Sequence, residues 1–334
     1  MTTIGRRNFI AALGTAAAWP LVARAQQPAM RRIGVLMGGV ETDALPQSFA
    51  AAFVQGLKQL GWIAGQNVRI DIRWNPGTPA LAKTYAAQLI GLKADVILAD
   101  TTPNLEGLRD ATSSVPTVFI RVSDPVEQGF VASLTNPGGN LTGFTAYDFS
   151  TGGKWLDLLK EASPQLARVG ILFNPDAPQS KFFLRAIEAA APALGVQAVA
   201  VPVHAAAEIE IEPALESLAQ QPNGGLIVPA DQFLRLYEKL VADLALRLRL
   251  PSICFDSDFP KVGGLMSYSV DVDYVEQFRQ AASYVDRILK GTKAGDLPIQ
   301  RPDKYKVIIN FKTAKALGLT IPLSLAGLAD EVIE

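Results

Sequence analysis

The feature that most constrains this chain is its alternation of short, fully apolar runs with longer segments of helical periodicity. In residues 95–99 and 117–120, a single polar residue, Asp95 or Thr117, is followed by a continuous apolar run, which is typical of strands buried on both sides in a parallel sheet. By contrast, residues 67–74 alternate strictly between apolar and polar, which favours a strand at the edge of a sheet. An apolar stripe at helical spacing lies between these strands, formed by Leu81, Tyr85, Leu89 and Leu92.

The alternation occurs twice in succession along the chain. Strands are expected again at residues 169–173, 196–203, 225–228 and 252–255, with helical stripes between and after them. A chain of 334 residues exceeds the size at which one core stops growing, about 250–300 residues. These observations predict an α/β protein with two doubly wound lobes, each built on a parallel sheet. The Pro-, Gly- and Asn-rich residues 125–144 are the expected crossing segment between the lobes.

The first 25 residues are interpreted as an export signal. Arg6 and Arg7 precede an apolar run of about 11 residues, which is shorter than the ~20 residues needed to span a bilayer. The Ala23-Arg24-Ala25 triplet matches a signal-peptidase site, so cleavage is expected after Ala25 and the mature protein in the periplasm. The paired arginines favour the twin-arginine route, and an ordinary secretory signal is the alternative.

Composition excludes several classes of chemistry. The chain has one cysteine, Cys254, and one histidine, His204, so an intrachain disulfide, Cys-rich metal clusters and multi-histidine zinc sites are excluded. Motifs for dinucleotides, phosphate loops and nucleophilic serines are absent from the sequence. With 31 basic and 32 acidic residues and no basic block, nothing indicates a nucleic-acid partner. We therefore expect no catalytic residues, no metal site and no cofactor.

Candidate binding residues follow from the topology, because ligands of open parallel sheets bind beyond the carboxyl ends of the strands. One expected strand is followed by Thr101-Thr102-Pro103, in which Thr102 suits a helix N-cap and Pro103 the first helical position. Free N–H groups and a Thr101 hydroxyl at that helix start would receive a carboxylate or phosphate. The alternative is a capped helix that binds only water.

Acidic and aromatic residues follow other expected strands. Asp124 and Asp231 each come directly after an apolar run, where a carboxylate either receives a ligand ammonium or caps the next helix. Tyr268 lies at a strand end beside the expected hinge, where its ring would stack on a ligand.

Several short motifs are spread along the chain: Leu60-Gly61-Trp62, Gly65-Gln66-Asn67-Val68, Ser123-Asp124-Pro125-Val126, Asn136-Pro137-Gly138-Gly139-Asn140-Leu141-Thr142-Gly143-Phe144, Gly153-Lys154-Trp155, Tyr284-Val285-Asp286-Arg287-Ile288-Leu289-Lys290-Gly291 and Lys312-Thr313-Ala314-Lys315-Ala316-Leu317-Gly318-Leu319. With these motifs the chain resembles the ABC-transporter substrate-binding family that includes tryptophan- and tyrosine-type binding proteins. The resemblance implies a type I periplasmic-binding-protein fold with three crossings between lobes, one of them near residues 271–273. Lobe 1 would then comprise residues 26–124 plus about 273–334, and lobe 2 about residues 145–270.

The resemblance also implies a set of cleft residues, namely Thr101, Thr102, Asp124, Asp148, Asn174, Asp231 and Tyr268. The chain departs from the family pattern at two places. Pro175 and Pro178 alter the spacing between Asn174 and Ser180, and Gln232 stands where an Asn is more usual. Both departures concern the identity of the ligand rather than the fold.

The resulting hypothesis is a periplasmic, monomeric solute receptor that closes on a small ligand and delivers it to the membrane subunits of an ABC permease. The ligand would be an amino acid with an aromatic or large apolar side chain. Its carboxylate would lie at Thr101 and Thr102, its ammonium at Asp231 with Asp124 or Asp148, and its side chain on Tyr268. A sensory ligand-binding module is the main alternative, and a periplasmic enzyme is disfavoured by the scarcity of His and Cys.

Overall fold

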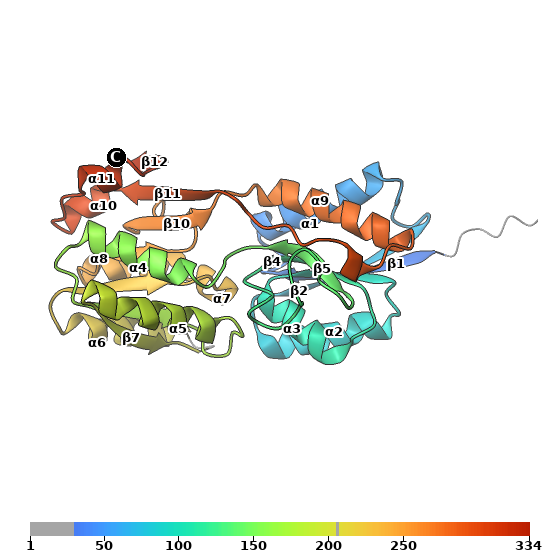
Figure 1. Cartoon of the computed structure of the whole chain (residues 1–334), viewed down its shortest axis with the longest axis horizontal. Helices are drawn as coiled ribbons and strands as arrows, with labels where there is room; N and C mark the ends of the chain where they lie inside the picture. Colours follow the sequence, from blue (N-terminus) through green and yellow to red (C-terminus); the bar gives the residue numbers. More distant parts are fainter. Residues whose placement is uncertain (1–29, 205–206) are drawn as a thin grey trace, which may run out of the picture.

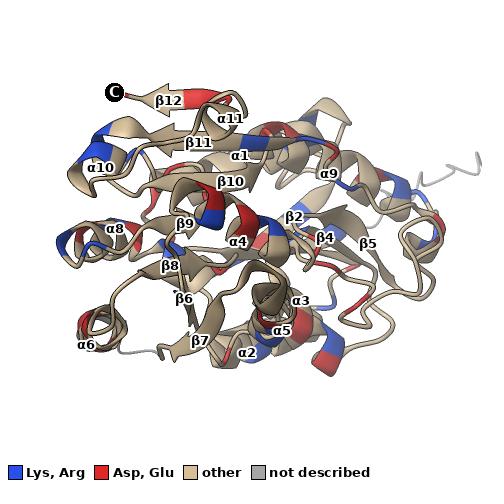
Figure 2. Ribbon diagram, turned by 60° about the vertical axis from the view of Figure 1, so that its left-hand side comes forward, with Lys and Arg blue, Asp and Glu red and all other residues tan. Residues whose placement is uncertain are grey.

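The computed structural model describes residues 30–204 and 207–334, and the expected signal peptide lies outside these ranges. The chain forms two lobes side by side, each a β-sheet covered by helices on both faces (Figure 1). Basic and acidic residues are interspersed over both lobes (Figure 2). None of the described helices has the length and apolar character to span a membrane.

The first lobe holds a five-stranded parallel sheet in the order β2-β1-β3-β4-β5. Its strands are β1 (Arg31–Gly38), β2 (Val68–Asn75), β3 (Val96–Asp100), β4 (Thr117–Val122) and β5 (Leu141–Thr145). Its main helices are α1 (Ala44–Gln59), α2 (Pro79–Gly91), α3 (Thr102–Ala111) and α9 (Tyr274–Leu289). Alternate residues of β1 and β3 pack against α1 and α9 on one face and against α2 and α3 on the other. This two-sided burial explains the fully apolar runs, and β2 is an edge strand as its alternation predicts.

The second lobe holds a seven-stranded sheet in the order β12-β11-β10-β9-β8-β6-β7. Its strands are β6 (Arg168–Phe173), β7 (Gln197–Pro202), β8 (Gly224–Val228), β9 (Ser252–Cys254), β10 (Met266–Val270), β11 (Tyr305–Asn310) and β12 (Glu331–Ile333). Its helices are α4 (Thr151–Ala162), α5 (Ser180–Ala190), α6 (Ala207–Ala219), α7 (Gln232–Arg235), α8 (Glu238–Arg247), α10 (Phe311–Ala316) and α11 (Leu323–Ala326). One core lies between the sheet and α4 and α5, and a second between the sheet and α6 and α8.

The chain crosses between the lobes three times, at residues 146–150, 271–273 and 301–304. The first and third crossings are tied together at their starts, because Thr145 N donates to the Gln300 carbonyl at 2.8 Å and Gln300 N donates to the Gly143 carbonyl at 2.9 Å. The second and third are joined by Asp271 N, which donates to the Lys304 carbonyl at 3.0 Å. The three crossings therefore form one compact hinge.

Two expected boundaries differ from this arrangement. Residues 125–144 do not cross between lobes, because residues 141–145 form β5 and pair with β4 in the first sheet. This five-residue strand is wholly buried, and the Gly- and Asn-rich residues before it favour turns, so the sequence did not predict a strand here. Residues 305–334 belong to the second lobe rather than the first, since β11 pairs antiparallel with β10 and β12 pairs with β11. Such long-range pairings extend the sheet after the chain has already left that lobe.

Candidate ligand-binding site

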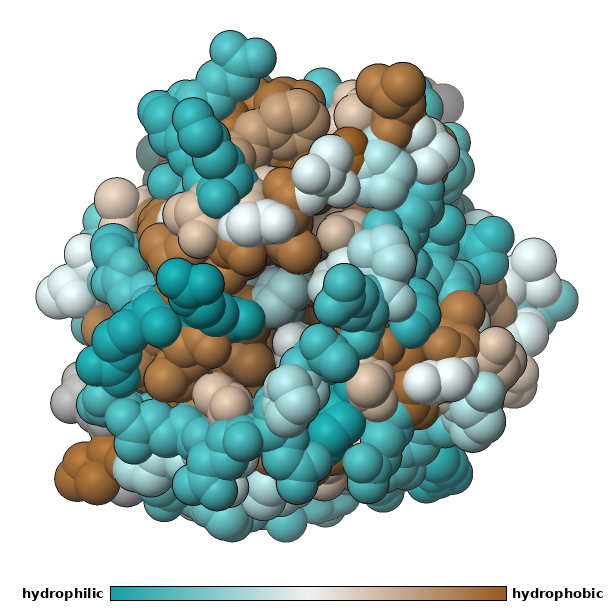
Figure 3. Space-filling view, turned by 90° about the vertical axis from the view of Figure 1, so that its left-hand side faces the viewer, coloured by the Kyte–Doolittle hydropathy of each residue, from teal (hydrophilic) through white to brown (hydrophobic). Residues whose placement is uncertain are grey.

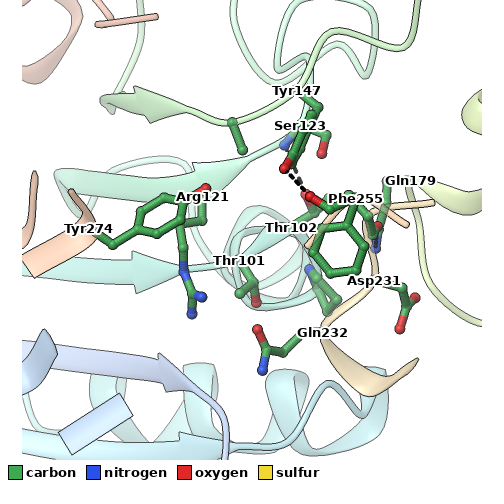
Figure 4. A pocket seen from close by; sticks show the side chains of 13 residues that line it. Thr101, Thr102, Arg121, Ser123, Tyr147, Gln179, Asp231, Gln232, Phe255 and Tyr274 are labelled. Atoms are coloured by element: carbon green, nitrogen blue, oxygen red, sulfur yellow. Dashed lines mark hydrogen bonds between the residues drawn. The ribbon is translucent and has the colours of Figure 1, made fainter. Parts of the chain in front are cut away.

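A cavity lies between the lobes at the carboxyl ends of strands from both sheets (Figure 4). The first lobe supplies residues at the ends of β3 and β4, and the second lobe supplies residues after β6, β8 and β9. The lining comprises Thr101, Thr102, Pro103, Arg121, Ser123, Ala146, Tyr147, Gln179, Ala230, Asp231, Gln232, Phe255 and Tyr274. This is the crevice in which open parallel sheets bind their ligands.

Thr101 holds an unusual backbone conformation at the first-lobe wall. Its φ of 78° and ψ of 157° lie in a region that is strained for a residue with a branched Cβ. The sheet holds it there, because Thr101 N donates to the Ile120 carbonyl at 2.9 Å. Helix α3 begins at Thr102, so Thr101 and not Thr102 is the N-cap residue, and its side chain forms no capping bond. The Thr101 Oγ1 is thus buried without a hydrogen-bond partner.

Arg121 is held by a fully buried carboxylate. Its Nε and Nη2 donate to the two oxygens of Asp100 at 2.7 and 2.6 Å, and Gly38 N also donates to Asp100 at 2.9 Å. The guanidinium lies against the rings of Phe49 and Tyr274, at 5.1 and 5.6 Å from their centroids. Burial opposes the charged form, but Asp100 outweighs this and raises the pKa of Arg121. Arg121 is the one basic residue in the lining of this cavity, and its charge is therefore already neutralised by Asp100.

Asp231 contributes a carboxylate from the second lobe. It is 5% exposed and caps α7, with Oδ1 accepting from Leu234 N at 2.9 Å. Its Oδ2 is buried without a partner. Burial raises the pKa of Asp231 to about 6, although the N–H groups of Leu234 and Phe233 act in the opposite direction. Gln179 lines the same wall and also has a buried Oε1 without a partner.

Three aromatic side chains complete the lining. The Tyr147 hydroxyl donates to the Phe255 carbonyl at 2.7 Å (Figure 4) and accepts from Val270 N at 3.3 Å. The Tyr147 and Phe255 rings meet edge to face at 6.1 Å between centroids. Tyr274 is buried beside Arg121, and this burial raises its pKa to about 12. The rings provide an apolar surface between the polar groups of the two lobes.

The lobes touch across the cleft. Gly77 follows β2 in the first lobe, and a Cβ built on it would lie 3.1 Å from the Phe233 backbone nitrogen in α7. Gly77 also has a φ of +106°, which favours glycine. The two lobes therefore contact each other at this point of the cleft.

Comparison with known proteins identifies the family of this chain. A family model described as ABC transporter substrate binding protein matches residues 32–333. This chain belongs to the ABC transporter substrate-binding protein family. It functions as the substrate-binding protein of an ABC transporter.

Relatives with known structures or names agree with this assignment. A tyrosine-binding protein of Clostridioides difficile is 27% identical over 267 residues, which cover 80% of this chain and 75% of the relative. A conserved domain protein from Vibrio cholerae is 26% identical with a TM-score of 0.78, covering 91% of this chain and 99% of the other. An ABC domain from Streptococcus pneumonia in complex with L-Trp is 25% identical with a TM-score of 0.77, covering 91% and 100%.

Three of the seven expected site residues of this substrate-binding protein line the cavity: Thr101, Thr102 and Asp231. Asp124 and Asp148 do not. Asp124 instead stabilises a turn, with Oδ1 accepting from Glu127 N at 3.0 Å. Asp148 lies 3.5 Å from the Arg301 guanidinium, so this ion pair joins two of the crossings.

Asn174 and Tyr268 also lie outside the lining. The Asn174 Oδ1 accepts from Asp176 N at 3.0 Å and thereby stabilises the turn that follows β6. The Tyr268 ring stacks on Tyr305 of the neighbouring strand, with centroids 4.9 Å apart. Side chains alternate between the two faces of a strand, so Ser269 rather than Tyr268 points toward the cleft.

Several lining residues were not among the seven expected site residues: Arg121, Ser123, Tyr147, Gln179, Gln232, Phe255 and Tyr274. Arg121, Ser123 and Phe255 carried a usable signal, because each follows or ends an apolar strand at the same edge as Thr101 or Asp231. Tyr147 lies in the first crossing and Tyr274 directly follows the second, and the crossings can be located only once the lobe boundaries are known.

A second hollow lies at the far end of the second lobe, which faces the viewer in Figure 3. This hollow lies at the ends of the strands that are opposite the cleft. It is lined by segments around residues 162–165, 219–224, 248–251 and 317–320. None of its lining residues has a buried polar side-chain atom without a partner. Nor does the described part of the chain contain a group of three His, Cys, Asp or Glu residues placed to hold a metal ion. The cleft is therefore the candidate site.

Proposed function

We propose that this substrate-binding protein works in the periplasm, where it closes on an L-amino acid with an aromatic or large apolar side chain and delivers it to an importer. The ligand bridges the lobes: its α-carboxylate lies at the start of α3 and its α-ammonium at Asp231. The expected export signal, with Arg6, Arg7 and the Ala25 cleavage site, supports the location. The tyrosine-binding relative and the neighbour with bound L-Trp support the ligand class.

The unpartnered Oδ2 of Asp231 is the observation that carries this proposal. A buried carboxylate oxygen without a donor is costly, and here no lining cation compensates it, since Arg121 is paired with Asp100. An ammonium group supplies three N–H donors and a positive charge, so it satisfies Asp231 and also the free Oε1 of Gln179. A ligand that carried only a carboxylate would add a second negative charge instead.

The opposite wall suits the carboxylate. Helix α3 has ten residues, and its first N–H groups lack partners within the helix. The positive end of the helix dipole and the Thr101 hydroxyl add to these donors. Because the two receptors belong to different lobes, a ligand that joins them favours the closed state, which couples binding to closure.

Titration calorimetry with three matched ligands tests the proposal. L-Tyrosine has both groups, tyramine lacks the carboxylate, and 3-(4-hydroxyphenyl)propanoate lacks the ammonium. We expect the amino acid to bind at least 100-fold more tightly than either analogue, because each analogue leaves one buried receptor unsatisfied. The same ranking is expected for L-leucine against its two analogues if the apolar side chain is aliphatic. Equal affinity for an amino acid and its deaminated analogue would contradict the assignment of Asp231.

A further inference from the structure

Another cavity adjoins the first in the cleft between the lobes. The two share Arg121, Tyr147, Gln232, Phe255 and Tyr274, and the second is the larger, about 220 Å³ against about 50 Å³. A ligand held at Thr101 and Asp231 therefore has room to extend past these shared residues. We call this second space the side-chain cavity, and its remaining lining is Leu45, Arg235, Asp256, Ser257, Asp258, Ser269, Val270 and Val272.

The shared residues include three rings. Tyr147 and Phe255 meet edge to face, and Tyr274 lies beside Arg121. Flat apolar groups pack well in such surroundings, because aromatic rings favour offset or edge-to-face contacts. The passage into the side-chain cavity therefore suits an aromatic ring.

Several residues that line only the side-chain cavity are polar. Arg235 Nε donates to Asp256 Oδ2 at 2.5 Å, and both side chains are largely buried. Asp256 Oδ1 also accepts from Asp258 N at 3.0 Å. A guanidinium carries five N–H groups, so Arg235 holds Asp256 and retains donors for a ligand.

Ser269 contributes a free hydroxyl to the lining of this cavity. It lies on β10, is 4% exposed, and its Oγ is buried without a hydrogen-bond partner. A serine hydroxyl both donates and accepts, so it matches a neutral polar group on a ligand. Ser267 provides a comparison on the same strand, because its Oγ is also buried and unpartnered but it does not line this cavity.

The charges of the side-chain cavity are paired. Arg121 has Asp100, and Arg235 has Asp256, with Asp258 half-exposed and 3.7 Å away. An ionised ligand group would disturb this balance, whereas a neutral group that donates and accepts hydrogen bonds would not.

We propose that the side-chain cavity selects an aromatic amino acid with a neutral hydrogen-bonding group on the far edge of its ring, and that the Ser269 hydroxyl forms a hydrogen bond with this group. Tyrosine has such a group, and phenylalanine lacks it. This inference rests on the proposed amino-acid function and makes it more specific.

The test measures dissociation constants of L-tyrosine and L-phenylalanine by calorimetry, with the mature wild-type protein, Ser269→Ala and Ser267→Ala. We expect wild type to prefer tyrosine at least tenfold, because phenylalanine leaves buried polar groups unpaired. Ser269→Ala should weaken tyrosine binding about 3- to 10-fold and leave phenylalanine binding unchanged. Ser267→Ala should keep the wild-type ratio, since it lies outside the cavity.

The outcomes separate the two proposals. Phenylalanine or leucine that binds as tightly as tyrosine overturns the inference and leaves the amino-acid function standing. An equal change of the ratio in Ser269→Ala and Ser267→Ala likewise overturns the role of Ser269. If tyrosine, phenylalanine, tryptophan and leucine all fail to bind, the proposed function itself fails and the inference with it. Thermal melting of each variant checks that the fold is retained.

Discussion

Replacing Asp231 by Asn should change stability and binding in opposite directions. The amide oxygen can still accept from Leu234 N, and Asn is as good an N-cap as Asp, so α7 keeps its first turn. What the substitution removes is a buried negative charge. In the ligand-free protein this charge is unfavourable, and in the complex it is the partner of the ligand ammonium.

The magnitude follows from the pKa. Burial raises the pKa of Asp231 from its ordinary 3.8 to about 6, a difference that corresponds to about 3 kcal/mol of lost stability when the group is ionised. Because the folded protein holds the proton more tightly than the unfolded chain, this cost is absent below pH 4. It develops between about pH 4 and 6 and is complete above. When the lobes open, water hydrates the carboxylate and reduces this cost. The variant should therefore be about 1–3 kcal/mol more stable than wild type.

Thermal melting at several pH values measures this effect. At pH 7 without ligand, Asp231→Asn should melt roughly 2–10 °C higher than wild type, and the difference should vanish near pH 4. In calorimetry the variant should bind the amino acid about 30- to several-thousand-fold more weakly, which corresponds to roughly 2–5 kcal/mol. A variant that is less stable than wild type at pH 7 and binds normally would refute this reasoning.

Four further outcomes are expected. Below pH 6 the affinity of wild type for its amino acid, measured by calorimetry, should fall about tenfold per pH unit as Asp231 is protonated. The affinity of Asp231→Asn should not change with pH, and a wild-type affinity that is also independent of pH would remove Asp231 from the site. Arg121→Gln leaves Asp100 buried without its cation and should destabilise the protein by about 3–5 kcal/mol in denaturant titrations, and an unchanged midpoint would show that the pair is dispensable. Gly77→Val places a branched side chain against α7, so small-angle scattering with saturating ligand should show less compaction than in wild type, while equal curves would exclude this contact from closure. N-terminal sequencing of exported protein should begin at Gln26, and Lys at both Arg6 and Arg7 should block export if the twin-arginine route is used; unchanged export would leave the general secretory route.

The parts of the fold that depend on local pattern were predictable. Two-sided apolar runs marked the central parallel strands, and strict alternation placed β2 at an edge. The topology then placed Thr101 and Asp231 at the ends of strands that meet in the cleft. These residues could be found because the carboxyl ends of parallel strands share one edge of the sheet.

The parts that depend on long-range pairing or on the facing of a side chain were not predictable. β11 joins the second sheet by an antiparallel pairing with β10 across about 40 residues, and β12 then pairs parallel with β11. No local period in the sequence encodes either pairing. Neighbouring residues of a strand face opposite sides of the sheet, so an error of one position assigned Tyr268 to the cleft instead of Ser269. Arg121 and Asp100 lie 21 residues apart, so their pairing required the two strands to be adjacent.

The most direct test of the central claim is native mass spectrometry of the protein purified from the periplasm of its own organism. An amino acid that bridges α3 and Asp231 should appear as a bound mass of one small molecule per chain. After release, that molecule should carry both a carboxyl and a primary amine. The Asp231→Asn protein, purified in parallel, should carry none. A co-purified acid that contains no amine, or equal occupancy of wild type and Asp231→Asn, would contradict the account.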